Sequence, residues 1–240
     1  MNQDNRPDLV IQGSVNASGG VYREVNVQGL GKIKGDLECH ELQCGGHVSI
    51  DGSMLATSVR VDGNASVRGG VKADTMEIYG QIDVNGDVKT TSLLVKGNAK
   101  VHGSLTSDEI QVKGFFKSSG DCEAEVFKAE GAFTIGGLLN AGQVEIQLHG
   151  NCQAREIGGE HIEVRKAGSS TLNKILKHIF NTTLTVDTVE GDEIYLEYTR
   201  AKVVRGNNIA IGPGCEIDLV EYTGEYRQDN GAQVKEHTKR

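Results

Sequence analysis

Residues 76–92 read MEIYGQIDVNGDVKTTS, and residues 93–109 read LLVKGNAKVHGSLTSDE. Both segments are seventeen residues long, and they carry the same kinds of residue at the same positions. Glycine stands fifth and eleventh in each, while apolar residues stand first, third, seventh, ninth and thirteenth. The two segments are therefore neighbouring copies of an internal repeat, which is the usual signature of a solenoid.

The repeat continues on both sides of these two copies. Glycine and apolar residues each recur in columns spaced by seventeen residues. The glycine columns are Gly29, Gly46, Gly63, Gly80, Gly97, Gly114, Gly131 and Gly35, Gly52, Gly69, Gly86, Gly103, Gly120, Gly137; one apolar column is Val25, Leu42, Val59, Met76, Leu93, Ile110, Phe127, Val144.

Within one copy, apolar residues alternate with polar ones, which is the period of a β-strand. Three short strands of about six, six and five residues fill the repeat and leave no room for a helix. Such strands close into a coil that stacks on the next coil at about 4.8 Å. The sequence therefore predicts an all-β fold, a parallel β-helix that forms a triangular solenoid of 17-residue coils.

The glycine columns are predicted to lie at two corners of each coil, where a positive φ or a close backbone approach excludes a side chain. The chain has 32 Gly, no Trp and only 5% aromatic residues. This composition predicts a narrow interior in which bulky rings are not stacked.

Both ends of the repeat depart from the pattern. A first coil, one residue short, is predicted to begin at Leu9 after a disordered leader at residues 1–8. The β-helix core is predicted over residues 9–164, and its phase slips near Ile157. Two more coils are predicted over 184–222, because Val186, Val203 and Val220 are again seventeen apart, as are Ile194 and Ile211. Residues 223–240 lack an apolar period and are predicted to be a disordered tail.

The segment 165–183 between these regions is predicted to be a linker that carries one short inserted helix. Its apolar residues follow the spacing i, i+3, i+4, i+7 and i+8 behind a hydroxyl N-cap, which is typical of an amphipathic helix over 171–180. We take this helix as a candidate partner-binding element through Leu172, Ile175, Leu176, Ile179 and Phe180.

Charge and targeting signals narrow the function. The net charge of −8 argues against nucleic acid as a partner, because duplex binding depends on neutralising phosphates. The N-terminus has no secretory signal, and no apolar run is long enough to span a membrane. The five cysteines are odd in number and form no C-x-x-C pair, which predicts a reducing, cytoplasmic compartment.

Catalytic and metal chemistry find little support in the pattern. Cys39 and Cys44 are predicted to be small buried residues rather than zinc ligands, and no metal or cofactor site is predicted. A carbohydrate-active enzyme would use clustered carboxylates, and an acyltransferase would need a histidine on a loop excursion. The uniform coils offer no loops to build such a site, so a non-enzymatic protein is predicted. The carboxylates weighed for catalysis are Asp108, Glu109, Asp121, Glu123 and Glu125.

With its columns from about Val21 to Val164 and its coil from Gly97-Asn98 to Gly103, the sequence resembles the bactofilins, polymer-forming bacterial cytoskeletal proteins. The resemblance implies a right-handed β-helix that assembles end to end into filaments without a nucleotide. It also implies a scaffold for cell shape, for wall synthesis or for motility structures. The region 165–222 departs from the family pattern.

An open end coil presents unpaired backbone groups and apolar ladders, which favours self-assembly. We expect Leu9, Ile11, Val15 and Val21 to contribute to an N-terminal polymerisation interface. The candidate partners are a second copy of the chain, a paralogous subunit, and cell-wall or flagellar assembly proteins, with membrane contact at most peripheral or through partners. The alternative is a non-polymerising rod that binds a partner complex through its outer face or through helix 171–180.

Overall fold

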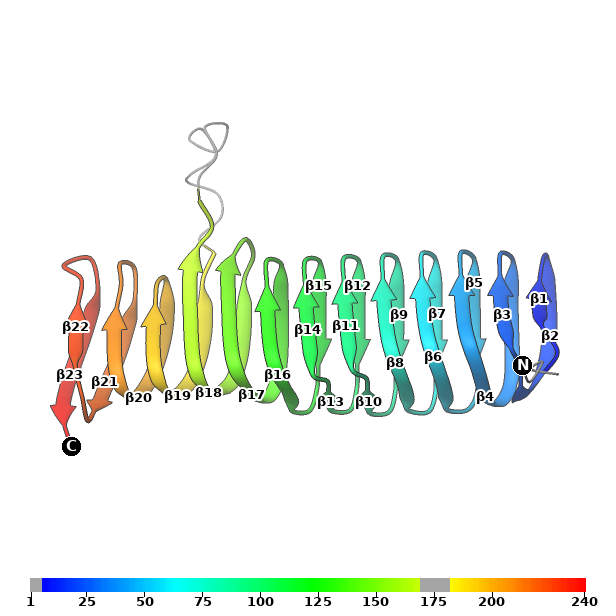
Figure 1. Ribbon diagram of the computed structural model, residues 1–240. Coiled ribbons are helices and arrows are strands. Elements are labelled where there is room, and N and C mark those ends of the chain that lie inside the picture. Colours follow the sequence, from blue (N-terminus) through cyan, green and yellow to red (C-terminus); the bar gives the residue numbers. More distant parts are fainter. Residues whose placement is uncertain (1–5, 169–181) are drawn as a thin grey trace, which may run out of the picture. The chain divides into compact units, whose positions relative to one another are not determined.

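The computed structural model describes residues 6–168 and 182–240 and divides the chain into two compact units, Met1–Gly120 and Asp121–Arg240 (Figure 1). All regular elements of the described residues are β-strands, and within each unit the strands pair in parallel. Each unit is thus a right-handed parallel β-helix, as predicted. The predicted helix 171–180 lies outside the described residues.

The described residues of the first unit, 6–120, form fifteen strands. Its register follows the predicted period: Leu93 pairs with Met76 on one side and with Ile110 on the other, each seventeen residues away. Only the first coil is shorter, since Leu9 pairs with Val25, sixteen residues away. The strands are β1 (Leu9–Ile11), β2 (Ser14–Val21), β3 (Glu24–Val27), β4 (Leu30–Cys44), β5 (His47–Ile50), β6 (Met54–Val61), β7 (Asn64–Val67), β8 (Val71–Ile78), β9 (Gln81–Val84), β10 (Val88–Lys89), β11 (Ser92–Val95), β12 (Asn98–Val101), β13 (Leu105–Thr106), β14 (Glu109–Val112) and β15 (Phe115–Ser118).

The second unit contains longer strands and less regular coils. Its first two strands keep the period, because Phe127 pairs with Val144. The next step is longer, since Phe133 pairs with Cys152, nineteen residues away. The strands are β16 (Cys122–Ala129), β17 (Ala132–Leu148), β18 (Cys152–Lys166), β19 (Leu184–Leu196), β20 (Thr199–Ile211), β21 (Glu216–Tyr222), β22 (Tyr226–Gln228) and β23 (Gln233–Lys239).

Two predicted alignments in this unit are wrong. A spacing of seventeen residues leads from Ile135 to Cys152, but Ile135 pairs with Ala154, and a register shift follows between Ile135 and Leu138. The phase therefore slips between Ile146 and Cys152, shortly before Ile157. The spacing of Val186, Val203 and Val220 is equally misleading. Val186 pairs with Ala201 and Ile194 with Ile209, because this coil has only fifteen residues.

The predicted disordered tail at 223–240 is also wrong, because β22 and β23 form a further coil. Ile217 pairs with Val234, and Ile209 pairs with Tyr226, both at a spacing of seventeen. The apolar period fades here because residues of an end coil are covered on one side only, so most positions of β23 remain exposed.

The interior holds aromatic rings, contrary to the prediction. Phe116, Phe127 and Phe133 are all fully buried. In the first unit the column beside Phe116 alternates in size, because Ala99 lies between Phe116 and Ile82. In the second unit, the rings of Phe127 and Phe133 pack edge to face with their centroids 5.3 Å apart. The small side chain of Ala99 on the neighbouring coil thus makes room for the ring of Phe116.

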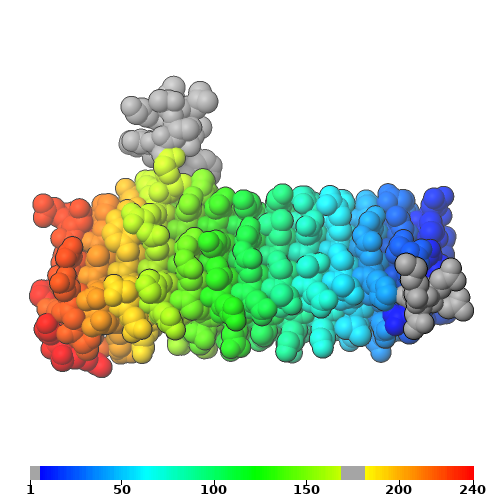
Figure 2. Space-filling view, viewed as in Figure 1, coloured from blue at the N-terminus to red at the C-terminus, as the bar shows by residue number. Residues whose placement is uncertain are grey.

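The first glycine column is explained by close backbone approach and not by positive φ. A Cβ atom added at Gly63, Gly80 or Gly97 would overlap the carbonyl oxygen of the column's preceding glycine. Positive φ occurs only at Gly13, Gly20, Gly35 and Gly214 among the described glycines. The coils of the first unit therefore stack closely at this corner. Figure 2 shows the atoms of successive segments of this unit, coloured from blue to green, packed against one another.

Candidate assembly site

The first coil of the first unit has an open backbone edge. Among the described residues, β1 pairs only with β3, and β2 pairs only with β4. The opposite edges of β1 and β2 carry N–H and C=O groups without a strand partner there. Such an edge is a template for pairing with another strand.

The structure separates the four residues predicted for this interface. Leu9 and Val15 belong to the open coil and are half-buried. Ile11 is fully buried, because Gly31 on the next coil leaves space for its side chain. Val21 is 47% exposed and lies in an outward column beside Glu38, away from the interior ladder. Of these four residues, Leu9 and Val15 are therefore the ones that belong to the interior ladder of the open coil and remain partly exposed.

The residues that precede β1 are tied to neighbouring coils. The amide of Arg23 donates to the carbonyl oxygen of Pro7 at 2.9 Å, and its guanidinium pairs with Asp8 at 2.5 Å. Arg6 pairs with Glu38 at 3.2 Å. These contacts hold residues 6–8 against the neighbouring coils, but they give neither β1 nor β2 a second strand partner among the described residues.

The last coil of the second unit also has partners on one side only among the described residues, since β22 pairs with β20 and β23 with β21. Its chemistry differs from that of the first coil. Tyr226 lies beside Ile209, and His237 lies beside Val220. The Tyr226 ring is 5.3 Å from Tyr222 and 4.9 Å from His237, centroid to centroid. Sequence reasoning missed this coil, although the spacing of Ile217 and Val234 was a signal for it.

The carboxylates considered for catalysis have structural contacts or lie exposed. Asp121 Oδ1 accepts the amide hydrogen of Leu138 on the next coil at 2.9 Å. Asp36 and Asp87 make the same contact with Ser53 and Ser104, both at 2.8 Å. This corner thus carries side chains that satisfy backbone donors of the following coil. Glu123 and Glu125 are exposed on the surface of the second unit.

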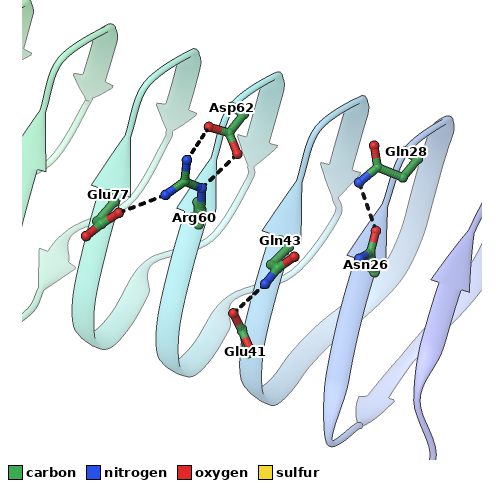
Figure 3. A network of polar contacts seen from close by, with 7 residues as sticks. All are labelled: Asn26, Gln28, Glu41, Gln43, Arg60, Asp62 and Glu77. Carbon is green, nitrogen blue, oxygen red and sulfur yellow. Dashed lines mark hydrogen bonds and ion pairs between the residues drawn. The ribbon is translucent and has the colours of Figure 1, made fainter.

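The outer face of the first unit carries amide, acidic and basic side chains that contact one another (Figure 3). Gln28 donates to Asn26 at 3.1 Å, and Gln43 donates to Glu41 at 2.7 Å. Arg60 makes a two-pronged contact with Asp62, both at 2.9 Å, and reaches Glu77 on the next coil at 3.3 Å. Most of these contacts join residues of one coil, which is typical of a solvated polar face.

The five cysteines are all buried and reduced. Burial raises the pKa of Cys39, Cys44, Cys152 and Cys215 to about 11, and it also raises the pKa of Cys122. Their thiols are therefore protonated at neutral pH, which disfavours metal binding. No group of three or more potential ligands for a metal ion occurs among the described residues.

The hollows of the second unit are surface grooves whose polar side chains pair with one another. The one of about 630 Å³ over β17–β20 contains Asn208, which donates to Glu193 at 2.6 Å, and Arg227, which pairs with Glu225 at 2.8 Å. Residues paired in this way are not poised for acid–base chemistry. In the described part of the chain, no helix is long and apolar enough to cross a membrane.

These features define a β-solenoid whose candidate binding element is the unpaired backbone edge of its first coil. The bactofilin family model, described as polymer-forming cytoskeletal, matches residues 3–89. The uncharacterized protein YhbE of Bacillus subtilis strain 168 is 59% identical over 233 residues, which are 96% of this chain and 97% of YhbE. YhbF of the same organism, also uncharacterized, is 40% identical over 100 residues, which are 41% of this chain and 40% of YhbF. No solved structure matches the chain. The chain belongs to the bactofilin family of polymer-forming cytoskeletal proteins.

Proposed function

We propose that this protein polymerises by stacking its end coils on those of other copies, and that the resulting filament is a non-enzymatic cytoplasmic scaffold. The observation that carries the proposal is the open edge of β1 and β2, with Leu9 and Val15 half-buried behind it. Pairing this edge with another coil would satisfy its backbone groups and bury both side chains. A head-to-tail contact that does not close would give an open filament, and like-with-like contacts at both ends would give a non-polar one.

The test introduces a charge at the open coil. Leu9→Lys and Val15→Lys should each raise the protein concentration needed for polymerisation by about tenfold or more, because a buried unpaired ammonium is costly. Asn16→Lys is the matched control, since Asn16 is an exposed position of β2. Ile11→Lys is unsuitable, because Ile11 is fully buried and its replacement would disturb folding.

Sedimentation and negative-stain electron microscopy of purified protein provide the readout. Filaments of wild type and Asn16→Lys that are lost in Leu9→Lys and Val15→Lys would support the proposal. A wild-type protein that stays monomeric over a wide range of salt and protein concentration would refute it. Unchanged filaments in both variants would refute the assignment of the interface to the first coil.

The cellular role is proposed as support for cell-shape, wall-synthesis or motility machinery, with a paralogous subunit as a candidate copolymer partner. The family description, polymer-forming cytoskeletal, supports a scaffold in general terms. Localisation of a tagged protein in cells, together with pull-down of wild type and Leu9→Lys, tests this role. A partner recovered only with the polymerising protein would support a filament-based scaffold, and a cell that keeps its shape and motility without the protein would contradict the role.

A further inference from the structure

A groove of about 580 Å³ runs along one side of the first unit and begins at Gly20 and Val21 on the outer side of the first coil. Its outward column joins five neighbouring coils through the paired residues Val21, Glu38, Leu55, Lys72 and Lys89. The corner beside this column is hollowed, because Gly20 and Gly70 carry no side chain there. The groove is therefore a product of particular residues rather than of the repeat alone.

One part of the groove is apolar. Val21 is 47% exposed and Leu55 is 44% exposed, and both belong to the few large aliphatic side chains left exposed in the described structure. Inward-facing Met54 and Val71 on neighbouring coils complete the floor. Water-exposed aliphatic groups in a concave surface favour burial against an apolar partner.

The other part of the groove carries two neighbouring lysines. Lys72 and Lys89 lie side by side on β8 and β10, and neither makes an ion pair or a hydrogen bond with any residue that the structure describes. The carboxylates of the groove are already engaged: Glu38 pairs with Arg6, and Asp36 and Asp87 accept backbone amide hydrogens. Asp36 and Asp87 keep their negative charge, but each points an oxygen at a backbone amide. The charged groups of the groove that lack a partner among the described residues are therefore the two lysines.

Beyond Val21 at its first coil, the groove crosses strands without a free backbone edge, because β4, β6 and β8 each have a strand on both sides. A partner that lies along the groove across these coils therefore binds through side-chain contacts and not by adding a strand. Four steps between coils at about 4.8 Å give a length of about 19 Å, which about six residues of extended chain can span.

We propose that this groove binds an extended segment of a partner protein in which aliphatic side chains are followed by acidic ones. The aliphatic side chains pack on Val21 and Leu55, and the acidic ones pair with Lys72 and Lys89. This inference goes beyond polymerisation: it places a partner on the side of the coils and leaves the open edge of β1 and β2 free.

The probe is a fluorescein-labelled hexapeptide of three leucines followed by three glutamates, and its binding is measured by fluorescence anisotropy. The reference peptide carries three lysines in place of the glutamates. Wild-type protein should bind the acidic peptide saturably and should bind the reference peptide at least tenfold more weakly, because charge complementarity determines the preference.

Two changes in the protein locate the site. Lys72→Glu combined with Lys89→Glu should weaken binding of the acidic peptide by about tenfold or more. The matched control is Lys100→Glu combined with Lys117→Glu, because these lysines are also neighbours on adjacent coils and lie in a different outward column. The control should bind within about twofold of wild type. Leu55→Ser tests the apolar part without changing charge and should also weaken binding. Circular dichroism confirms that each variant is folded, and electron microscopy shows whether it still polymerises.

The proposal is overturned if the acidic peptide does not bind, if both peptides bind alike, or if the control weakens binding as much as the groove variant does. Sedimentation with vesicles of anionic phospholipid provides a further arm. Binding of the vesicles without binding of the peptide would assign the groove to a membrane surface instead. Loss of polymerisation in the groove variant but not in the control would assign it to a second copy of the chain. Because polymerisation is measured separately, failure of this proposal leaves the open-edge proposal intact, and the reverse also holds.

Discussion

Gly80→Ala is the most direct test of how the coils of the first unit stack. A Cβ atom at Gly80 would overlap the carbonyl oxygens of Gly63 and Asp62 and would lie 2.7 Å from the carbonyl carbon of Asp62. All three atoms belong to the backbone of the preceding coil, so no side chain can move away to relieve the contact. The two coils must separate locally, or the corner must change its path.

The expected loss in the free energy of unfolding follows from the contacts at that corner. The amide of Gly80 donates to Val61 at 2.9 Å, and the amide of Gln81 donates to Gly63 at 2.8 Å. Losing two backbone hydrogen bonds costs about 1–3 kcal/mol, at about 0.5–1.5 kcal/mol each. Overpacking adds about 1–3 kcal/mol. We therefore expect Gly80→Ala to lower the free energy of unfolding by about 2–6 kcal/mol, a large share of the total stability of an ordinary domain.

The assay is unfolding in guanidinium chloride, followed by circular dichroism at a protein concentration where sedimentation detects no polymer. With a denaturant dependence of about 6 kcal/mol per molar, the midpoint should fall by about 0.3–1 M. Gly168→Ala is the control, because a Cβ atom there meets no atom of the described residues within 4 Å. It should leave the midpoint unchanged or raise it slightly. Equal midpoints for the two variants would refute the argument that close backbone approach explains the glycine column.

Three further outcomes are expected. Phe133→Ala should lower the free energy of unfolding by about 3–5 kcal/mol in the same assay, because the ring is fully buried. Phe115 is 36% exposed, so Phe115→Ala should lower the free energy of unfolding clearly less. Hydrogen bonds and ion pairs with Arg205 and Arg240 lower the pKa of Glu221, so its carboxylate holds these arginines at neutral pH. The amides of β23 should therefore be protected from hydrogen exchange at neutral pH, and this protection should be lost as the pH falls through the lowered pKa. In Glu221→Gln, the protection of β23 should be weak at every pH. The five buried thiols should react with iodoacetamide at pH 8 only after denaturation, and rapid labelling of folded protein would contradict their burial.

The sequence predicts the first unit well because every interior position of a coil has the same surroundings as its equivalent one coil away. Leu42, Val59 and Met76 are paired as their spacing indicates. Equal coil length makes the spacing a direct measure of the register. The open edge of the first coil was predictable for the same reason, although the burial of Ile11 depends on the missing side chain of Gly31.

The second unit was less predictable because its coils differ in length while the alternation of apolar residues persists. Between β19 and β20, Gly191 pairs with Gly206, and the coil has only fifteen residues. Alternation has a period of two, so a coil shortened by two residues keeps its inward positions while the spacing of seventeen is lost. Val186 and Val203 are then seventeen apart by coincidence, and a spacing taken from the first unit joins residues that do not pair.

The groove of the first unit was beyond sequence reasoning for a different reason. Outward side chains mostly contact residues of their own coil, as Arg60 does with Asp62, so coil stacking depends little on which side chains stand outside. An outward column is then free to vary from coil to coil, and its period carries no information about binding. Only the register, which brings Val21 and Leu55 near Lys72 and Lys89, shows that exposed aliphatic groups and unpaired lysines share one hollow. In this fold, the interior specifies how coils stack, and the outward columns are the part of the structure in which recognition of a partner can be encoded.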